Sequence, residues 1–425
     1  MPGRGTPISR PIPLLRMFFL NALLAVLTGV WGLCLASGLA DGSAPTPKPA
    51  LPAALSDQPG DIERGRRIVL DRERGDCVVC HAMPLPGRQF HGSLGLPLDG
   101  IGSRSGAAEL RRRLVNPKAF DPHTIMPAYH STQGLHRVLG SYRGRPILSA
   151  QEIEDVVAYL LSLRADGPAE LPVSRPHRVD PERTETGSPT VVDGRRSGYV
   201  YLSEENRRLQ DDAFGNPGLL WVERGSALWA QPHGLSHTSC ASCHADPAVS
   251  MRGTRTRYPR FDTRRKGLIN LEQQINRCRE ERLGAAAYAY ESDDLLALSA
   301  LVGFQSRGLP LQVDIEGPAQ AFFEAGRAFF ERRRGQLDMA CAQCHDGYAG
   351  QRLRGDILSQ GQINGFPIYR HAWQSLGSSH RMFAWCNTAI RAEPFAYGAD
   401  EYVNLELYLA WRGRGLGVET PAVRR

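Results

Sequence analysis

The segment Cys341-Ala342-Gln343-Cys344-His345 decides the fold of this 425-residue chain. Its pattern, two cysteines three positions apart and then a histidine, recurs as Cys77-Val78-Val79-Cys80-His81 and as Cys240-Ala241-Ser242-Cys243-His244. Two thiols on one turn can each add to a vinyl group of a haem, while the histidine that follows reaches the iron. The three motifs therefore predict three covalently bound haem c groups, with His81, His244 and His345 as iron ligands.

Nine cysteines in an exported protein would normally suggest disulfides. Zinc binding or dithiol redox chemistry is the other common use of a Cys-x-x-Cys pair, but a zinc ribbon needs two such pairs within one short module. The pairs of this chain lie far apart, which favours haem attachment. Three cysteines remain outside the motifs, and Cys34 is interpreted as an ordinary apolar residue of the leader. The other two are Cys278 and Cys386.

Length and composition indicate an exported globular protein. With 42% hydrophobic and 22% charged residues, the chain has room for two or three domains and is not disordered. Basic residues up to Arg16 precede an apolar run from 17 to about 40, so residues 1–40 are predicted to be a signal peptide or a membrane anchor. A Pro-rich linker over 41–60 follows. Covalent haem also fits export, so we expect a periplasmic protein that meets the membrane only through such an anchor.

The charge balance gives no support for one class of partner. The formal charge of +7 includes Arg4, Arg10 and Arg16 of the leader. Three haems bring roughly six propionate charges, so the holoprotein is expected to be near neutral. The basic composition therefore predicts no nucleic-acid partner.

Three regions of the chain follow one plan. Each begins with a helix-like segment in which a glycine precedes a large apolar residue by four positions, and each continues with a haem motif. The pairs are Gly65 and Val69, Gly225 and Trp229, Gly326 and Phe330. Each region closes with an amphipathic helix pattern, at 149–163 with a capping box of Ser149 and Glu152, at 292–304 and at 400–411.

This plan predicts a mainly α fold of three class I cytochrome c-like domains, at 61–165, 200–310 and 311–425. The spacing from glycine to haem cysteine is the same in the last two regions and shorter in the first. We therefore expect the last two to form a tandem-repeat dihaem unit. A Pro- and charge-rich linker at 166–199 separates them from the first region.

Each haem iron needs a second axial ligand, which a c-type domain supplies between the haem motif and the last helix. In the first region we predict Met126, which precedes a proline, and the alternatives are His91, His123 and His130. In the second and third regions, Cys278 and Cys386 occupy matching places, and we predict that both are thiolate ligands. The alternatives are one disulfide between them or inert buried thiols. In the third region His371 and His380 are rival ligands.

Stretches outside the haem motifs carry a more specific resemblance. They are Arg277-Cys278-Arg279, Tyr290-Glu291-Ser292-Asp293 and Ala392-Glu393-Pro394-Phe395-Ala396-Tyr397-Gly398. With them the chain resembles the SoxAX cytochromes, the thiosulfate-oxidising Sox proteins of sulfur-oxidising bacteria, with the two usual subunits fused. Residues 61–165 resemble the mono-haem SoxX subunit, and residues from about 200 to 420 resemble the dihaem form of SoxA.

The resemblance implies an enzyme, an L-cysteine S-thiosulfotransferase. SoxAX joins thiosulfate oxidatively to a cysteine of the carrier SoxYZ, forming a cysteine S-thiosulfonate, and two electrons pass through haems to cytochrome c. The resemblance also makes Cys386, as thiolate ligand of the third haem, the catalytic cysteine. The family's substrate-binding arginine stands four residues before this cysteine, where the chain has Met382. Arg381 is therefore the candidate here, with Arg391 as a substitute.

The predicted ligands suit this chemistry. Thiolate ligation lowers the potential of a haem and methionine ligation raises it, so electrons should pass from the Cys386 haem to the Met126 haem. Cys278 would then bind a structural or low-potential haem. Two other functions stay open: a carrier-independent thiosulfate dehydrogenase that makes tetrathionate, and a plain multihaem electron-transfer cytochrome. The product of the reaction separates the three.

Overall fold

The computed structural model describes residues 53–85, 87, 90–164 and 190–425. The predicted leader, most of the first linker and most of the second linker lie outside these ranges. Helices make up most of the regular structure, and every strand is two or three residues long, which confirms the mainly α class. No helix in the described ranges is long and apolar enough to cross a membrane.

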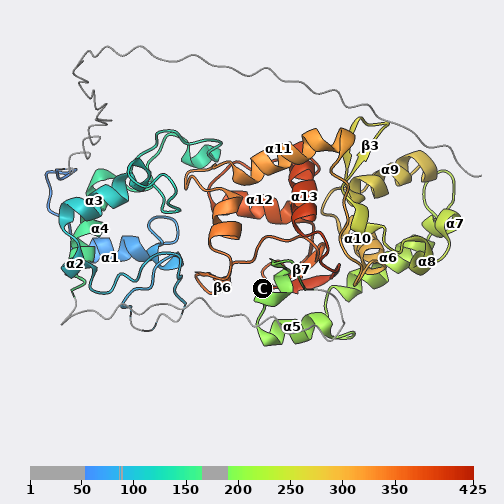
Figure 1. Ribbon diagram of the computed structural model, residues 1–425, viewed down its shortest axis with the longest axis horizontal. Helices are drawn as coiled ribbons and strands as arrows, with labels where there is room; N and C mark the ends of the chain where they lie inside the picture. Colours follow the sequence, from blue (N-terminus) through green and yellow to red (C-terminus); the bar gives the residue numbers. More distant parts are fainter. Residues whose placement is uncertain (1–52, 86, 88–89, 165–189) are drawn as a thin grey trace, which may run out of the picture. The chain divides into compact units, whose positions relative to one another are not determined.

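The region from 53 to 164 is built on two helices, α1 (Ile62–Leu70) and α4 (Ala150–Ser162), which lie side by side (Figure 1). Helix α4 begins where the sequence predicts it, because Ser149 and Glu152 form the reciprocal capping box. The shorter helices α2 (Ile101–Arg104) and α3 (Ala107–Val115) pack against α4. Apolar residues of these helices form one core with the first haem motif.

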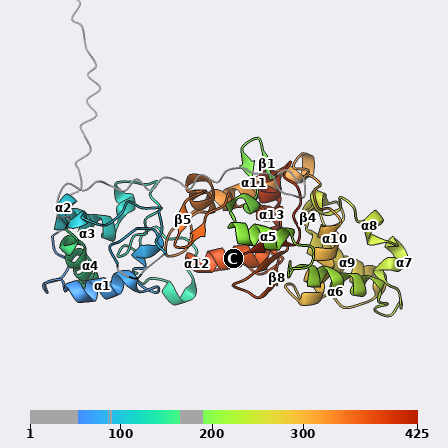
Figure 2. The ribbon, with the colours of Figure 1, turned by 90° about the horizontal axis from the view of Figure 1, so that it is seen from below.

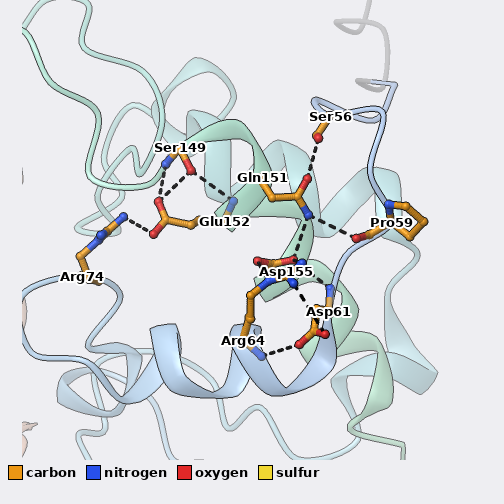
Figure 3. Close-up of polar contacts among 9 residues, drawn as sticks. All are labelled: Ser56, Pro59, Asp61, Arg64, Arg74, Ser149, Gln151, Glu152 and Asp155. Atoms are coloured by element: carbon orange, nitrogen blue, oxygen red, sulfur yellow. Dashed lines mark hydrogen bonds and ion pairs between the residues drawn. The ribbon is translucent and has the colours of Figure 1, made fainter.

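Hydrogen bonds and ion pairs fix the start of α1 against α4 (Figure 3). The Asp155 carboxylate of α4 accepts a hydrogen bond from the backbone N–H of Asp61 at 2.8 Å and from Nε of Arg64 at 2.9 Å. Gln151 donates to the same carboxylate at 3.0 Å and accepts from the Ser56 hydroxyl at 2.6 Å. The N-terminal segment of this region is thus held on α4.

The region from 190 to about 310 begins with a small hairpin and a helix: β1 (Val191–Val192), β2 (Arg195–Arg196) and α5 (Glu204–Asp211). Its main helices lie together in both ribbon views (Figures 1 and 2): α6 (Leu219–Ala230), α9 (Leu271–Leu283) and α10 (Asp293–Phe304). Helix α10 begins at the N-cap Ser292, as predicted, and is buried on every side in its second and third turns. Between α6 and α9 come α7 (Cys240–His244), α8 (Pro247–Ser250) and the hairpin of β3 (Arg260–Asp262) with β4 (Gly267–Ile269).

The region from about 311 to 425 pairs α11 (Gln320–Glu331) with α13 (Asp400–Arg412). After a hairpin of β5 (Arg352–Leu353) and β6 (Asp356–Ile357), a three-stranded sheet has β7 (Ile368–Arg370) in its centre. Strand β7 is antiparallel to β8 (Ser375–Gly377) and parallel to β9 (Ala422–Arg424). Helix α12 (Ser379–Ala389) follows β8 directly, because the Ser378 hydroxyl caps its first turn.

Each of the three helix pairs crosses at a glycine that the sequence pattern singled out. A Cβ atom on that glycine would approach a backbone carbonyl oxygen of the partner helix to 2.0–2.3 Å, too close for any side chain. The contacts are Gly65 with Asp155, Gly225 with Ala297, and Gly326 with Asn404. The apolar residues four positions later are buried too: Val69, Trp229 and Phe330.

A buried polar network joins the second and third regions. Glu406 of α13 lies 3.2 Å from His380 of α12 and 3.6 Å from the guanidinium of Arg255. It also accepts a hydrogen bond of 3.0 Å from Asn270, the N-cap of α9. The network therefore ties together the starts of the two helices that carry Cys278 and Cys386.

Candidate haem sites and catalytic cysteine

The histidines of the first and third motifs are held in the same way. Nδ1 of His81 lies 2.7 Å from the carbonyl oxygen of Leu96, and Nδ1 of His345 lies 2.8 Å from that of Ser359. Donation from Nδ1 fixes the tautomer and leaves Nε2 for iron. Burial lowers the pKa of both imidazoles, which favours the neutral form that binds a metal.

A glycine lies against each of these two rings. A Cβ atom on Gly95 would lie 2.2 Å from Cε1 of His81, and one on Gly361 would lie 2.9 Å from Cγ of His345. The loop that accepts the histidine proton therefore also covers the ring, and only glycine allows the approach.

The second motif is built differently. His244 ends α7 and is exposed, and its ring centroid lies 5.7 Å from that of Trp229. Within the described ranges no hydrogen bond reaches the His244 ring, and Cys243 is exposed as well. The second histidine is thus oriented by packing rather than by a carbonyl acceptor.

The motif cysteines suit covalent attachment of haem. Each pair lies about one turn apart: on η1 (Cys77–Val79) and the residue after it, on α7, and at the turn that leads into η7 (Gln343–Gly347). All eight cysteines of the described ranges are free thiols. Together with a histidine whose Nε2 is available, these donors fit haem c at the first and third motifs. The second offers the same donor set.

Met126 lies in the loop between α3 and α4, half-buried against the core of the first region. Of its rivals, His123 is exposed and Nδ1 of His91 accepts a backbone N–H at 3.1 Å. Nδ1 of His130 lies 3.0 Å from a backbone carbonyl, which leaves its Nε2 open as in His81 and His345. Met126 stays the predicted ligand and His130 stays its alternative.

Cys278 and Cys386 stand at the same position of two similar units. Each is the eighth residue of a helix, α9 or α12, and each helix directly follows a β-hairpin. Both thiols are free, so the structure contains no bridge between them. Each faces the haem motif of its own region: the Cys278 thiol interacts electrostatically with Cys240, and the Cys386 thiol with Cys341.

The Cys386 sulfur lies in an apolar place with one positive neighbour. Burial raises the pKa of the Cys386 thiol to about 12, and the Cys341 thiol adds to this effect. The guanidinium of Arg370 acts in the opposite direction. Cys386 is half-buried by its exposed area, and a thiol whose pKa is raised in this way needs a nearby cation or metal to exist as a thiolate.

The rival histidines of the third region face elsewhere. His380 is fully buried: its Nδ1 accepts the backbone N–H of Gly398 at 3.0 Å, and its Nε2 lies 3.2 Å from Glu406. Its ring stacks on Tyr290 with a centroid distance of 5.2 Å. His371 packs edge-on against Tyr369 at 5.8 Å. Both nitrogens of His380 are therefore occupied by protein groups.

The two arginines singled out from the sequence make contacts away from Cys386. Nη1 of Arg381 donates to the Ser375 hydroxyl at 2.9 Å, and its guanidinium lies 4.5 Å from the Trp373 ring centroid. Arg391 donates to Gln336 and to the backbone carbonyl of Glu73, each at 2.6 Å. A catalytic role of Arg381 stays a prediction.

Arg370 is not among the residues predicted from the sequence. It stands in a strand, whereas the predicted arginines lie within or just after the helix that contains Cys386. Its sequence signal is a change of charge between the two hairpins, because Asp262 ends β3 where Arg370 ends β7.

The loop that contains Met126, between α3 and α4 and here called the Met126 loop, forms hydrogen bonds with the third region. Arg333 donates to the carbonyl of Pro122 at 2.5 Å, and Gln343, between the cysteines of the third motif, donates to that of Thr124 at 3.3 Å. The ion pair of Arg354 with Asp76, at 2.6 Å, holds the first motif nearby. Cys80 and Cys344 are close enough to interact electrostatically. The first and third motifs are thus neighbours.

Comparisons with known proteins point to one family. Residues 224–311 match the family described as SoxA/TsdA, cytochrome c domain. The L-cysteine S-thiosulfotransferase subunit SoxA of Pseudaminobacter salicylatoxidans is 43% identical over 230 residues, which is 54% of this chain and 80% of that protein. The SoxA subunit of Rhodovulum sulfidophilum is also 43% identical, over 229 residues and the same shares.

A solved structure agrees with these matches. The crystal structure of SoxXA from P. pantotrophus is similar with a TM-score of 0.53 and 41% sequence identity. The match covers 54% of this chain and 87% of that chain. Similarity in sequence and in fold therefore extends over about half of the present chain.

Proposed function

Since the chain belongs to the SoxA family of c-type cytochromes, we propose that it acts as an L-cysteine S-thiosulfotransferase. It joins thiosulfate to a cysteine of a SoxYZ-like carrier protein, forms a cysteine S-thiosulfonate and passes two electrons to a cytochrome c. The relatives named above are subunits of this enzyme, and a match over 80% of their length supports the transfer. We place the reaction in the periplasm.

The proposal includes three haem domains, with a SoxX-like domain at 61–165 fused to two SoxA-like domains at 200–310 and 311–425. Three helix pairs that cross at glycines, each next to one Cys-x-x-Cys-His motif, support this division. The hairpin followed by a cysteine-bearing helix, present twice, supports a tandem repeat of the last two domains.

We assign two residues that would hold the iron of each haem. They are His81 with Met126, His244 with Cys278, and His345 with Cys386. The hydrogen bonds from Nδ1 support the assignment of His81 and His345. The electrostatic contacts with the motif cysteines support the assignment of Cys278 and Cys386.

Cys386 carries the sulfur chemistry in two balanced steps. Its thiolate forms a sulfur–sulfur bond with the outer sulfur of thiosulfate, and this step releases two electrons. The carrier thiolate then attacks that same sulfur, so the thiosulfonate moves to the carrier and Cys386 leaves as a thiolate. When bound, the haems supply the oxidising equivalents, one electron per ferric iron, and the positive charge that keeps Cys386 ionised.

The observation that carries the choice of Cys386 over Cys278 is the position of the first region. Its Met126 loop contacts the third region next to Cys344, through Gln343 and Arg333. A domain that takes electrons away from the reaction belongs beside the catalytic motif. The first region contacts the third region in this way. Among the described residues, the hydrogen bonds between the first region and another region all involve the third.

Identification of the product tests this function. The oxidised full chain, thiosulfate and a SoxYZ-like carrier should give a carrier whose mass has increased by one thiosulfate, with haem reduction. Free tetrathionate with an unmodified carrier would instead indicate a carrier-independent thiosulfate dehydrogenase. If the haems are reduced neither by thiosulfate alone nor by thiosulfate with the carrier, the chain is a plain electron-transfer cytochrome.

A further inference from the structure

We infer that Arg370 is the residue that holds the sulfonate oxygens of thiosulfate beside Cys386. This inference rests on the proposed function and names the anion receptor of the same site. It concerns the end of strand β7, a place that neither the motifs nor the spacing along α12 identify.

Arg370 is buried and held in one orientation. Its side chain belongs to a residue that is 8% exposed, and Nε donates to a backbone oxygen of Arg425 at 2.6 Å, next to strand β9. The guanidinium carbon lies 4.1 Å from the ring centroid of Trp385. Stacking and one hydrogen bond thus fix the guanidinium plane before any ligand binds.

The free side of this guanidinium faces the helix surface that carries Cys386. Nη1 lies 3.7 Å from the sulfur of Met382, which stands one turn before Cys386 on the same face of α12. The charge of Arg370 and the Cys386 sulfur interact electrostatically. The positive group therefore lies next to the reacting sulfur.

Arg370 has hydrogen-bonding capacity left for a ligand. Within the described ranges no Asp or Glu side chain lies within ion-pair distance of it, and Nη2 has no hydrogen-bond partner; the terminal residue Arg425 contacts Nε alone. Burying an arginine without an acidic side-chain partner is costly, so the Nη1 and Nη2 edge is expected to bind an anion. The two N–H groups of a guanidinium edge match two oxygens of a sulfonate, which leaves the outer sulfur free for Cys386.

The second region has a different residue at the strand end that corresponds to Arg370. Asp262 ends β3 as Arg370 ends β7, and it forms an ion pair of 2.7 Å with Arg277. The end of β3 is therefore an acidic residue paired with an arginine, whereas the end of β7 is an arginine without an acidic side-chain partner. This difference in charge assigns the substrate anion to the third region.

The test compares Arg370→Gln with Arg370→Lys in the haem-replete full chain. Calorimetry measures thiosulfate binding to the electrochemically reduced protein, which cannot turn over, and kinetics then measure KM and kcat. The glutamine variant should weaken thiosulfate binding and raise KM by about 10- to 100-fold, with a smaller change in kcat. The lysine variant, which keeps the charge but not the two-pronged guanidinium edge, should recover part of the loss.

Arg260→Gln is the matched control, because Arg260 stands in the equivalent hairpin and stacks on Tyr258 at 5.1 Å. It should leave binding and KM unchanged. Unchanged binding in Arg370→Gln with full haem content, a larger loss in Arg381→Gln, or equal losses in the Lys and Gln variants would each overturn the inference. A wild-type chain that binds thiosulfate through Arg370 but does not modify the carrier would refute the proposed function alone.

Discussion

Helices α9 and α12 begin alike and carry a cysteine at the same position, but the two cysteines have different neighbours. Beside Cys278, the amide nitrogen of Gln274 lies 3.2 Å from the sulfur, and Asp262 neutralises Arg277. Beside Cys386, the residue one turn earlier is Met382, and Arg370 has no Asp or Glu side chain among the described residues within ion-pair distance.

The haem motifs that these cysteines face also differ. The third motif has a buried histidine that donates to Ser359, and it borders the first region. The second motif has an exposed His244 and lacks such a neighbour within the described ranges. One backbone plan thus supplies two cysteine sites, and under the proposed function their surroundings rather than their helix position would determine which of them performs chemistry.

Deletion of one haem at a time should give the largest difference between these regions. Cys341→Ser with Cys344→Ser should leave two haems and reduce carrier modification below about one thousandth of the wild-type rate, because the catalytic site is lost. Cys240→Ser with Cys243→Ser should also leave two haems but keep most of the rate. A haem assay and a coupled rate measurement check both, and equal losses would show that the second region takes part in the reaction.

Replacing Met126 tests whether the first haem has a thioether ligand, in contrast to the thiolate ligands proposed for the other two haems. Met126→Ala should remove the near-infrared band of a methionine-ligated haem and lower the potential of the first haem by on the order of 0.1 V or more. Met83→Ala is the control, since Met83 is buried in the same core without being a predicted ligand. Redox titration with near-infrared spectra measures both, and an unchanged band in Met126→Ala would assign the ligand elsewhere.

A methyl group added at the helix crossing is expected to destabilise the second and third regions equally. Gly225→Ala and Gly326→Ala should each lower the free energy of unfolding by about 1–3 kcal/mol, because the added methyl group meets a carbonyl oxygen. Gly140→Ala, with no atom near its Cβ, should change it by less than about 0.5 kcal/mol. Thermal unfolding of the three variants decides whether the crossings are equivalent.

The helix crossing of the first region involves a charged residue, Asp155, whereas the glycines of the other two crossings contact Ala297 and Asn404. We therefore expect the stability of the first region to depend slightly on pH. Burial alone would raise the pKa of Asp155, but hydrogen bonds from Arg64 and the Asp61 amide hold it below its usual value. A depressed carboxylate pKa contributes stability above the unfolded pKa of about 3.9, and this contribution is lost as pH falls through the folded pKa.

Asp155→Asn should therefore destabilise the first region by about 1–2 kcal/mol at pH 7 and progressively less below about pH 4. Ser162→Ala, which removes a neutral hydrogen bond to the Tyr159 carbonyl on the same helix, is the control with a pH-independent effect. Denaturant unfolding between pH 3 and 7 would refute the assignment if the Asn variant lost the same stability at every pH.

Local patterns predicted much of the fold. The capping box of Ser149 and the start of the helix after Ser292 follow from side-chain capping within a few residues. Helix α13 has no side-chain cap, and only the acidic residues of its first turn favour a start at Asp400. The glycines were visible as a pattern because a close helix crossing admits no side chain. These features depend on neighbours in sequence or on a single steric demand.

The missed features depend on contacts between distant segments. Arg370 approaches α12 only because β7 pairs with β8 and β9, and β9 comes from the far end of the chain. The neighbours of Arg391 in the first region cannot be inferred from its position near Cys386. Helical spacing places residues along one helix, whereas sheet pairing and contacts between regions placed these two arginines.

The central claim is that Cys386 performs the sulfur chemistry and Cys278 does not, although their helices are alike. A single-turnover experiment with oxidised, haem-replete Cys386→Met and Cys278→Met tests it most directly, with thiosulfate and carrier added together and the carrier analysed by intact mass. The account predicts a modified carrier and reduced haems for Cys278→Met, and neither for Cys386→Met. A carrier modified at the wild-type rate by Cys386→Met with all its haems in place would contradict it.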